Sequence, residues 1–132
     1  MPDASPTRNL IGGFGIAVAD LDRSAAFYRS TFGMVDVMTF DLPHMQEIVL
    51  GFESGKGASL VLMQYTDGSD NSHQGHPLKL VFYVEDPLSV AAAVAAAGLE
   101  VPMPPAPVAS LGGALVGFVT DPDGHLIEIL PR

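Results

Sequence analysis

Hydrophobic and polar residues alternate along most of this chain, and the period of the alternation changes at defined points. Over residues 11–18 the even positions are mostly large and apolar and the odd positions small, as in a strand with one buried face. Over residues 20–33 apolar residues recur at helical spacing, after an aspartate cap and before a closing glycine. Three more strands are then predicted, over about residues 35–40, 46–52 and 58–64.

The same order of elements returns after a polar, glycine-containing segment, residues 65–77, which is typical of a linker. A strand is predicted over residues 78–84, and Asp86 and Pro87 then begin an alanine-rich helix that ends at Gly98. A short strand is expected at about residues 99–102. An irregular proline-rich stretch follows, which either covers a groove or serves as a stiff connection. The last two strands are predicted over about residues 114–119 and 126–130.

Matching positions in the two halves indicate a duplication. Three matches are 66 residues apart: Asp20 with Asp86, Val18 with Val84, and Gly51-Phe52 with Gly117-Phe118. The chain is therefore predicted to be a single α+β domain, residues 1–132, with module one at about 10–64, a linker at 65–77 and module two at 78–132. Two paired βαβββ modules would form a concave sheet with the helices on its outer face.

The alternation also predicts which residues face the groove of this sheet. Shifting Gly13 forward by 66 residues gives Lys79, and shifting Glu128 back by 67, with one inserted residue, gives Val61. These four positions are expected to be equivalent and to line the groove. The predicted ligand-contacting residues are Gly13, Gly15, Val61, Met63, Val81 and Tyr83.

Two segments carry a family resemblance. Residues 19–28 (ADLDRSAAFY), followed by Phe32-Gly33-Met34, and residues 118–128 (FVTDPDGHLIE) resemble signatures of the vicinal oxygen chelate superfamily, which includes glyoxalases, bleomycin-resistance proteins and extradiol dioxygenases. The resemblance covers nearly the whole chain and implies paired βαβββ modules and a homodimer. It also implies a divalent ion in the metal-dependent members, held by His, Glu or Gln, His and Glu at the four groove positions.

Only Glu128 matches that ligand set in this sequence. Gly13 and Val61 offer no ligand atom, and the Lys79 cation would repel a metal ion. No metal cofactor is therefore expected at the superfamily's usual position. Lys79 and Glu128 are instead interpreted either as a catalytic pair or as a salt bridge that closes an abandoned metal site.

The four histidines are all expected in solvated loops. Three of them, His44, His73 and His76, are the candidates for recruiting a divalent metal by another route. His125 follows the glycine of the Asp-Pro-Asp-Gly turn, in which the aspartates are expected to accept hydrogen bonds from nearby backbone N–H groups.

Composition excludes several classes of partner. The net charge of −9 disfavours nucleic acid and permits a basic ligand. There is no cysteine, and no apolar run reaches the roughly 18 residues that a membrane span needs. The N-terminal residues lack the pattern of a signal peptide, so a cytoplasmic location is expected.

Three functions remain open from sequence. The first is binding of a small organic molecule in the groove, as in drug sequestration. The second is a metal-independent lyase, isomerase or cyclase that uses Lys79 and Glu128. The third is a metal-dependent glyoxalase-like lyase or dioxygenase that recruits other ligands.

Overall fold

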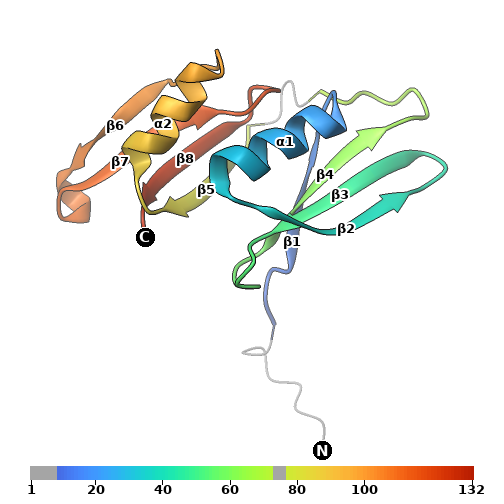
Figure 1. Ribbon diagram of the computed structural model, residues 1–132, viewed down its shortest axis with the longest axis horizontal. Helices are drawn as coiled ribbons and strands as arrows, with labels where there is room; N and C mark the ends of the chain where they lie inside the picture. Colours follow the sequence, from blue (N-terminus) through green and yellow to red (C-terminus); the bar gives the residue numbers. More distant parts are fainter. Residues whose placement is uncertain (1–8, 73–76) are drawn as a thin grey trace, which may run out of the picture.

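The computed structural model describes residues 9–72 and 77–132, which form two consecutive βαβββ modules (Figure 1). The elements of module one are β1 (Gly13–Ala17), α1 (Leu21–Phe32), β2 (Val35–Asp41), β3 (Met45–Gly51) and β4 (Ser59–Tyr65). The elements of module two are β5 (Lys79–Val84), α2 (Pro87–Ala96), β6 (Met103–Val108), β7 (Ala114–Thr120) and β8 (Leu126–Pro131). No helix in the described ranges is long and apolar enough to cross a membrane.

Both helices begin at the predicted aspartates, and α1 ends at the predicted glycine, whereas α2 ends at Ala96, just before the predicted Gly98. The side chain of Asp20 accepts a hydrogen bond from the N–H of Arg23, and Gly33 ends α1 with a φ of 72°. The side chain of Asp86 accepts from the N–H groups of Leu88 and Ser89 at the start of α2. These caps satisfy backbone groups that the helices leave unpaired, so short local patterns determine the helix boundaries.

Each module forms its own four-stranded sheet, in the order β1-β4-β3-β2 for module one and β5-β8-β7-β6 for module two. The first and last strands of each module pair in parallel, with Gly15 opposite Val61 and Val81 opposite Glu128. This register confirms the offsets of 66 and 67 residues expected from the repeat. No ladder joins β1 to β5 within the described residues, so both strands keep a free edge.

The core lies between the sheets and the two helices, which lie on the same side of them (Figure 1). Ile16, Leu80 and Phe82 are buried there, as their even positions predict, whereas Lys79, Val81 and Tyr83 are exposed on the opposite, open face. Phe14 departs from this pattern. Its side chain is 46% exposed and lines a pocket between the two modules.

The predicted strand at residues 99–102 was wrong, because the sheet partner begins later, at Met103. Strand β6 contains three prolines and pairs only with β7, so it is an edge strand. Proline lacks a backbone donor but is tolerated on an edge, where one side of the strand needs no partner. The ladder between β6 and β7 shifts register between Met103 and Ala106. The proline-rich stretch that the sequence left open as a groove cover or a stiff connection is thus this strand with the turn that follows it.

The Gly-Phe match in the predicted repeat is not a structural equivalence. Gly51 ends β3 opposite Val35, whereas Gly117 lies within β7 opposite Ile129. Phe52 packs against the core, and Phe118 neighbours Glu128 on the open face. The middle strands of module two are therefore offset differently from its outer strands, and the 66-residue spacing of these pairs is a coincidence.

Candidate functional site

Lys79 and Glu128 form an ion pair on the open face of module two. Lys79 begins β5 and Glu128 lies in the neighbouring β8, so alternation brings both side chains to one face. The distance between Lys79 Nζ and Glu128 Oε1 is 2.6 Å, and the side chains are 46% and 17% exposed. Lys79 Nζ also lies 5.9 Å from the ring centroid of Phe118, within the range of a cation–π contact.

The equivalent positions of module one carry no charge. A Cβ at Gly13 would lie 3.7 Å from Val61 Cγ2, and a Cβ at Gly15 would lie 3.2 Å from Met63 Cε. Val61 and Met63 therefore lie over the two glycines and narrow the space above β1. No hydrogen bond or ion pair within the described residues joins these positions to Lys79 or Glu128. Their roles in ligand binding stay predictions.

The four positions do not fit a divalent metal ion. Glycine and valine provide no ligand atom, and the ammonium of Lys79 occupies Oε1 of Glu128, the single carboxylate in the set. A hard ion needs several oxygen or nitrogen ligands. The chemistry available at these four positions is therefore that of one carboxylate and one ammonium.

A pocket of about 360 Å³ lies between the two modules, beside the free edge of β5. Both modules contribute to its wall, and the lining residues are Phe14, Met34, Phe52 and the segments 56–60 and 79–83. Lys79, Val81 and Tyr83 thus belong both to the open face and to this pocket. A free strand edge also offers backbone donors and acceptors to whatever enters.

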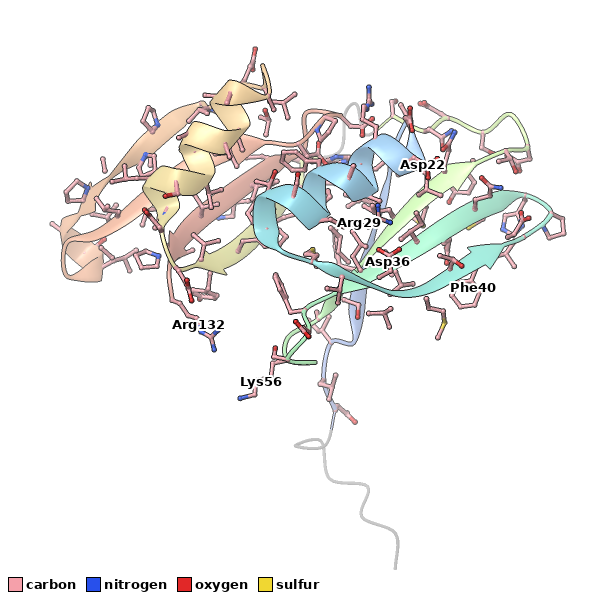
Figure 2. The ribbon with its side chains drawn as sticks, in the orientation of Figure 1. Asp22, Arg29, Asp36, Phe40, Lys56 and Arg132 are labelled. Carbon is pink, nitrogen blue, oxygen red and sulfur yellow. The ribbon has the colours of Figure 1, made fainter. Side chains whose placement is uncertain are left out.

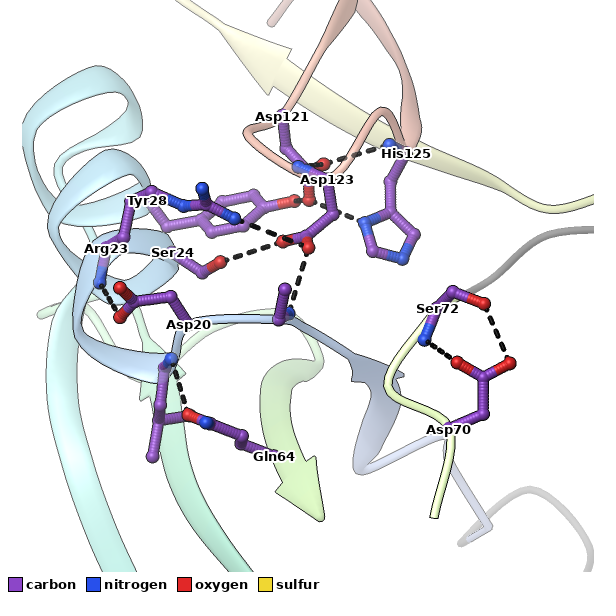
Figure 3. Close-up of polar contacts among 12 residues, drawn as sticks. Asp20, Arg23, Ser24, Tyr28, Gln64, Asp70, Ser72, Asp121, Asp123 and His125 are labelled. Carbon is purple, nitrogen blue, oxygen red and sulfur yellow. Dashed lines mark hydrogen bonds and ion pairs between the residues drawn. The ribbon is translucent and has the colours of Figure 1, made fainter. Parts of the chain in front are cut away.

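A second cluster of polar groups is buried in the turn before β8 (Figure 3). Asp121 Oδ1 accepts hydrogen bonds from the backbone N–H groups of Asp123 and His125, both at 2.9 Å. Asp121 Oδ2 accepts from the hydroxyl of Tyr28 at 2.7 Å and lies 2.7 Å from His125 Nδ1. Burial opposes ionisation of Asp121, but the contacts with His125 and Tyr28 outweigh it and hold the pKa of Asp121 below its ordinary value.

The neighbouring carboxylate, Asp123, holds the start of α1. Its Oδ1 accepts from the N–H of Ala19 at 2.9 Å and lies 3.5 Å from a guanidinium nitrogen of Arg23, while its Oδ2 accepts from the hydroxyl of Ser24 at 3.1 Å (Figure 3). The turn of module two is thereby fastened to the first helix of module one. The prediction that the aspartates bind nearby backbone groups is confirmed for Asp121, whereas Asp123 binds a backbone group 104 residues away.

Asp121, Asp123 and His125 offer ligand atoms within 4.8 Å of one another, a spacing that suits a metal ion. However, both oxygens of each carboxylate already interact with protein donors. The prediction that His125 lies in a solvated loop was wrong, because its side chain is fully buried. Its burial could have been predicted from strand alternation, since His125, Ile127 and Ile129 are alternate residues that all face the core.

The other histidines do not join Glu128 in the described part of the chain. His44 is exposed in the turn between β2 and β3, and its carbonyl accepts from the N–H of Thr66. Glu128 lies on β8 in the other sheet. His73 and His76 lie outside the described residues.

Comparison with known proteins agrees with this architecture. A sequence model of the Glyoxalase/Bleomycin resistance protein/Dioxygenase superfamily matches residues 10–129. The chain belongs to this superfamily. Among superfamily relatives, a lactoylglutathione lyase from Haemophilus influenzae is 33% identical over 118 residues, which cover 87% of each chain. A putative lactoylglutathione lyase from Brassica oleracea is 32% identical, but the match covers only 42% of that longer protein.

Solved structures of the superfamily show the same fold. The trypanothione-dependent glyoxalase I of Leishmania major superposes with a TM-score of 0.73 at 26% identity, over 93% of this chain and 86% of that one. A glyoxalase I mutant from Zea mays gives a TM-score of 0.75 at 23% identity, over 93% of this chain and 44% of the maize chain. The fold is shared with enzymes, whereas function depends on the residues in the site.

Proposed function

We propose that this superfamily member binds a small organic molecule on its open face and in the adjoining pocket, without a metal ion at the superfamily's usual position. The Lys79–Glu128 ion pair carries the proposal, because it occupies two positions at which the metal-dependent relatives are expected to bind the ion. Lys79 is half-exposed and has three donors, one of which bonds Glu128. The other donors remain able to bind an oxygen of the ligand.

The surroundings support an apolar body for this ligand. Val81 and Tyr83 are exposed beside Lys79, and Phe14 enters the same pocket. Exposed large side chains at one concave place are typical of a binding site. Glu128 is less exposed than Lys79, so its main role would be to hold the ammonium in position.

The lactoylglutathione lyase relatives favour a second candidate, metal-independent lyase or isomerase chemistry. In that reaction Glu128 would remove a proton next to a carbonyl group, and Lys79 would stabilise the negative charge that develops on the carbonyl oxygen. Glu128→Gln keeps the shape of the side chain but removes the base. We expect this change to abolish turnover and to spare most ligand binding.

Metal analysis of protein purified without chelator tests the metal-free proposal. We expect less than stoichiometric Ni, Zn, Fe or Mn, and no effect of chelator on the melting temperature. Stoichiometric metal that is lost in Glu128→Gln would overturn the proposal and favour the metal-dependent alternative. His44→Ala, His73→Ala and His76→Ala would then identify the recruited ligands.

Ligand binding is tested with a thermal-shift screen of small organic molecules on wild type and Lys79→Met. A ligand present at 100 times its Kd stabilises the folded state by about 2.7 kcal/mol. We expect the shift to shrink in Lys79→Met. A hit whose shift is unchanged in Lys79→Met would remove Lys79 from the binding site.

A further inference from the structure

The basic residues of this acidic protein are unevenly partnered. The sequence has six lysines and arginines against fifteen aspartates and glutamates. In the described part of the chain, three basic side chains lie within ion-pair distance of an acidic one: Arg23 of Asp123, Arg29 of Asp36 and Lys79 of Glu128. Within the described residues, Lys56 and Arg132 form no ion pair, although acids outnumber bases more than twofold. Their charges are therefore available to a ligand.

Lys56 and Arg132 line the same depression, which has a volume of about 510 Å³. Figure 2 shows both side chains extending from the same side of the molecule. The backbone at each is held in place, since the N–H of Lys56 donates to Ser54 Oγ at 3.3 Å and the N–H of Arg132 donates to the carbonyl of Val84 at 3.1 Å. Gly55 and Gly57 flank Lys56 with positive φ and complete its turn.

This depression adjoins the pocket between the modules. Phe52, Lys56, Gly57 and Tyr83 line both, so a ligand can extend from one into the other. Among the described lining residues of the two, Glu53 has the one side-chain carboxylate, and Arg132, the last residue of the sequence, adds a backbone carboxylate. Because Glu128 neutralises Lys79, the side chains of Lys56 and Arg132 are the cations that remain here, so this region lacks the excess of acid seen in the net charge of −9.

We infer that the ligand of this site is an organic anion, with an apolar body between the modules and an acid group bound between Lys56 and Arg132. A guanidinium binds a carboxylate or phosphate through two parallel hydrogen bonds, and an ammonium adds a compact charge. Phe52 and Tyr83 provide the apolar connection between the two regions. This inference rests on the proposed function and adds that the ligand is negatively charged. The net charge of the protein alone would have permitted a positively charged ligand.

Three probes with one aromatic body and different charges test the inference: naphthoate, naphthamide and naphthylmethylamine, measured by isothermal titration calorimetry at low salt. We expect naphthoate to bind about tenfold more tightly than naphthamide, because a hydrogen bond to a charged group is worth about one order of magnitude in affinity. Naphthylmethylamine should bind no better than naphthamide. Added salt should weaken only naphthoate binding.

The double variant Lys56→Met with Arg132→Met should remove the preference for naphthoate over naphthamide. Arg29→Met is the control, because it also removes a positive charge. Arg29 lies on α1, is paired with Asp36 of β2 and lines neither pocket. The control should retain the preference. A double variant that retains it would overturn the inference.

The two proposals fail in distinguishable ways. If naphthamide binds to wild type as tightly as naphthoate, the anion inference is wrong, but the apolar binding site stands. If none of the three probes binds, the proposed function fails and the inference fails with it.

Discussion

At the scale of single residues, the side chain of Asp121 combines hydrogen bonds within its own turn with a bond to a distant helix. Turn chemistry predicts its bonds to the backbone N–H groups of Asp123 and His125, because they lie within four residues. Nothing local predicts its bond to Tyr28, which is 93 residues away in the sequence. Burial and the neighbouring carboxylate raise the pKa of the Tyr28 hydroxyl well above its usual range, so Tyr28 stays a hydrogen-bond donor.

Asp121→Asn should destabilise the protein by about 3 kcal/mol, because a buried carboxylate that accepts from several donors would be replaced by a group with one acceptor oxygen. The measurement is urea unfolding at several pH values. The folded-state pKa of Asp121 lies below its ordinary value of 3.8, so its stabilisation is present above that pH and is lost as pH falls through the folded pKa. The difference between wild type and variant should therefore be constant near neutral pH and shrink in strong acid.

Asp67→Asn is the control for this experiment, since Asp67 accepts hydrogen bonds from the nearby Ser69 in an exposed turn. It should change stability little. Equal destabilisation by the two changes would contradict the role assigned to Asp121.

The Lys79–Glu128 pair was predictable from the sequence because it depends on two local rules. Strand alternation determines the face of each residue, and the repeat determines the register. The burial of His125 follows the same alternation, but its position directly after a turn glycine favoured a loop. The positions of Lys56 and Arg132 at one depression depend on how the modules pack, which no local pattern encodes.

At the scale of elements, the sequence predicted both helices and seven strands close to their observed bounds, and missed β6. The correctly predicted elements have short-range signals in the sequence, namely helix caps, C-terminal glycines and strand alternation. Strand β6 carries three prolines, which ordinarily argue against a strand. β6 forms a strand because it pairs with β7, so its own residues do not contain the information that predicts it.

Gly117 in β7 allows β6 to approach closely. A Cβ at this position would lie 2.9 Å from the carbonyl oxygen of Met103 and 2.9 Å from the nitrogen of Pro105, both backbone atoms. Gly117→Ala should therefore destabilise the protein by about 1–3 kcal/mol, because the backbone at the register shift must move. Urea unfolding measures the loss.

The matched control is Gly12→Ala, where no atom of the described residues other than Gly12 and its chain neighbours lies within 4 Å of the added carbon. It should be close to neutral. If Gly117→Ala left the free energy of unfolding unchanged, β6 would be able to move away at no cost, and the close approach would not contribute to stability.

At the scale of the whole molecule, the two modules share one core. Helix α1 of module one stacks Phe32 against Phe82 of module two, with ring centroids 4.1 Å apart, and Tyr28 stacks on Phe82 at 6.1 Å. The Tyr28–Asp121 hydrogen bond connects the modules beside this stack. We therefore expect the chain to unfold as one cooperative unit rather than module by module.

Phe82→Ala should lower the free energy of unfolding by about 3–5 kcal/mol, because it empties the aromatic contact between the modules. Far-ultraviolet circular dichroism and tyrosine fluorescence, followed together in urea, should give one coincident transition in wild type. Leu88→Ala, at an exposed position of α2, is the control and should cost little. Two separated transitions in wild type would contradict the shared core.

Exposed apolar side chains along β2 predict a homodimer. Val37 and Met38 are 56% and 51% exposed on a strand that pairs only with β3, and such an edge invites association. Sedimentation velocity should show a dimer for wild type and a monomer for Val37→Lys with Met38→Lys. A monomeric wild type would refute this prediction.

The shared core has a consequence for the ancestry of the protein. A single βαβββ unit released from this chain would leave the helix face that carries Phe32 in water, because Phe82 of the other unit covers it. The ancestor that preceded the duplication is therefore expected to have worked as two identical subunits. Fusion of two copies turned that concentration-dependent association into a permanent one. In the present chain the equivalent positions differ, since Lys79 and Glu128 of the second half form an ion pair where the first half has Gly13 and Val61.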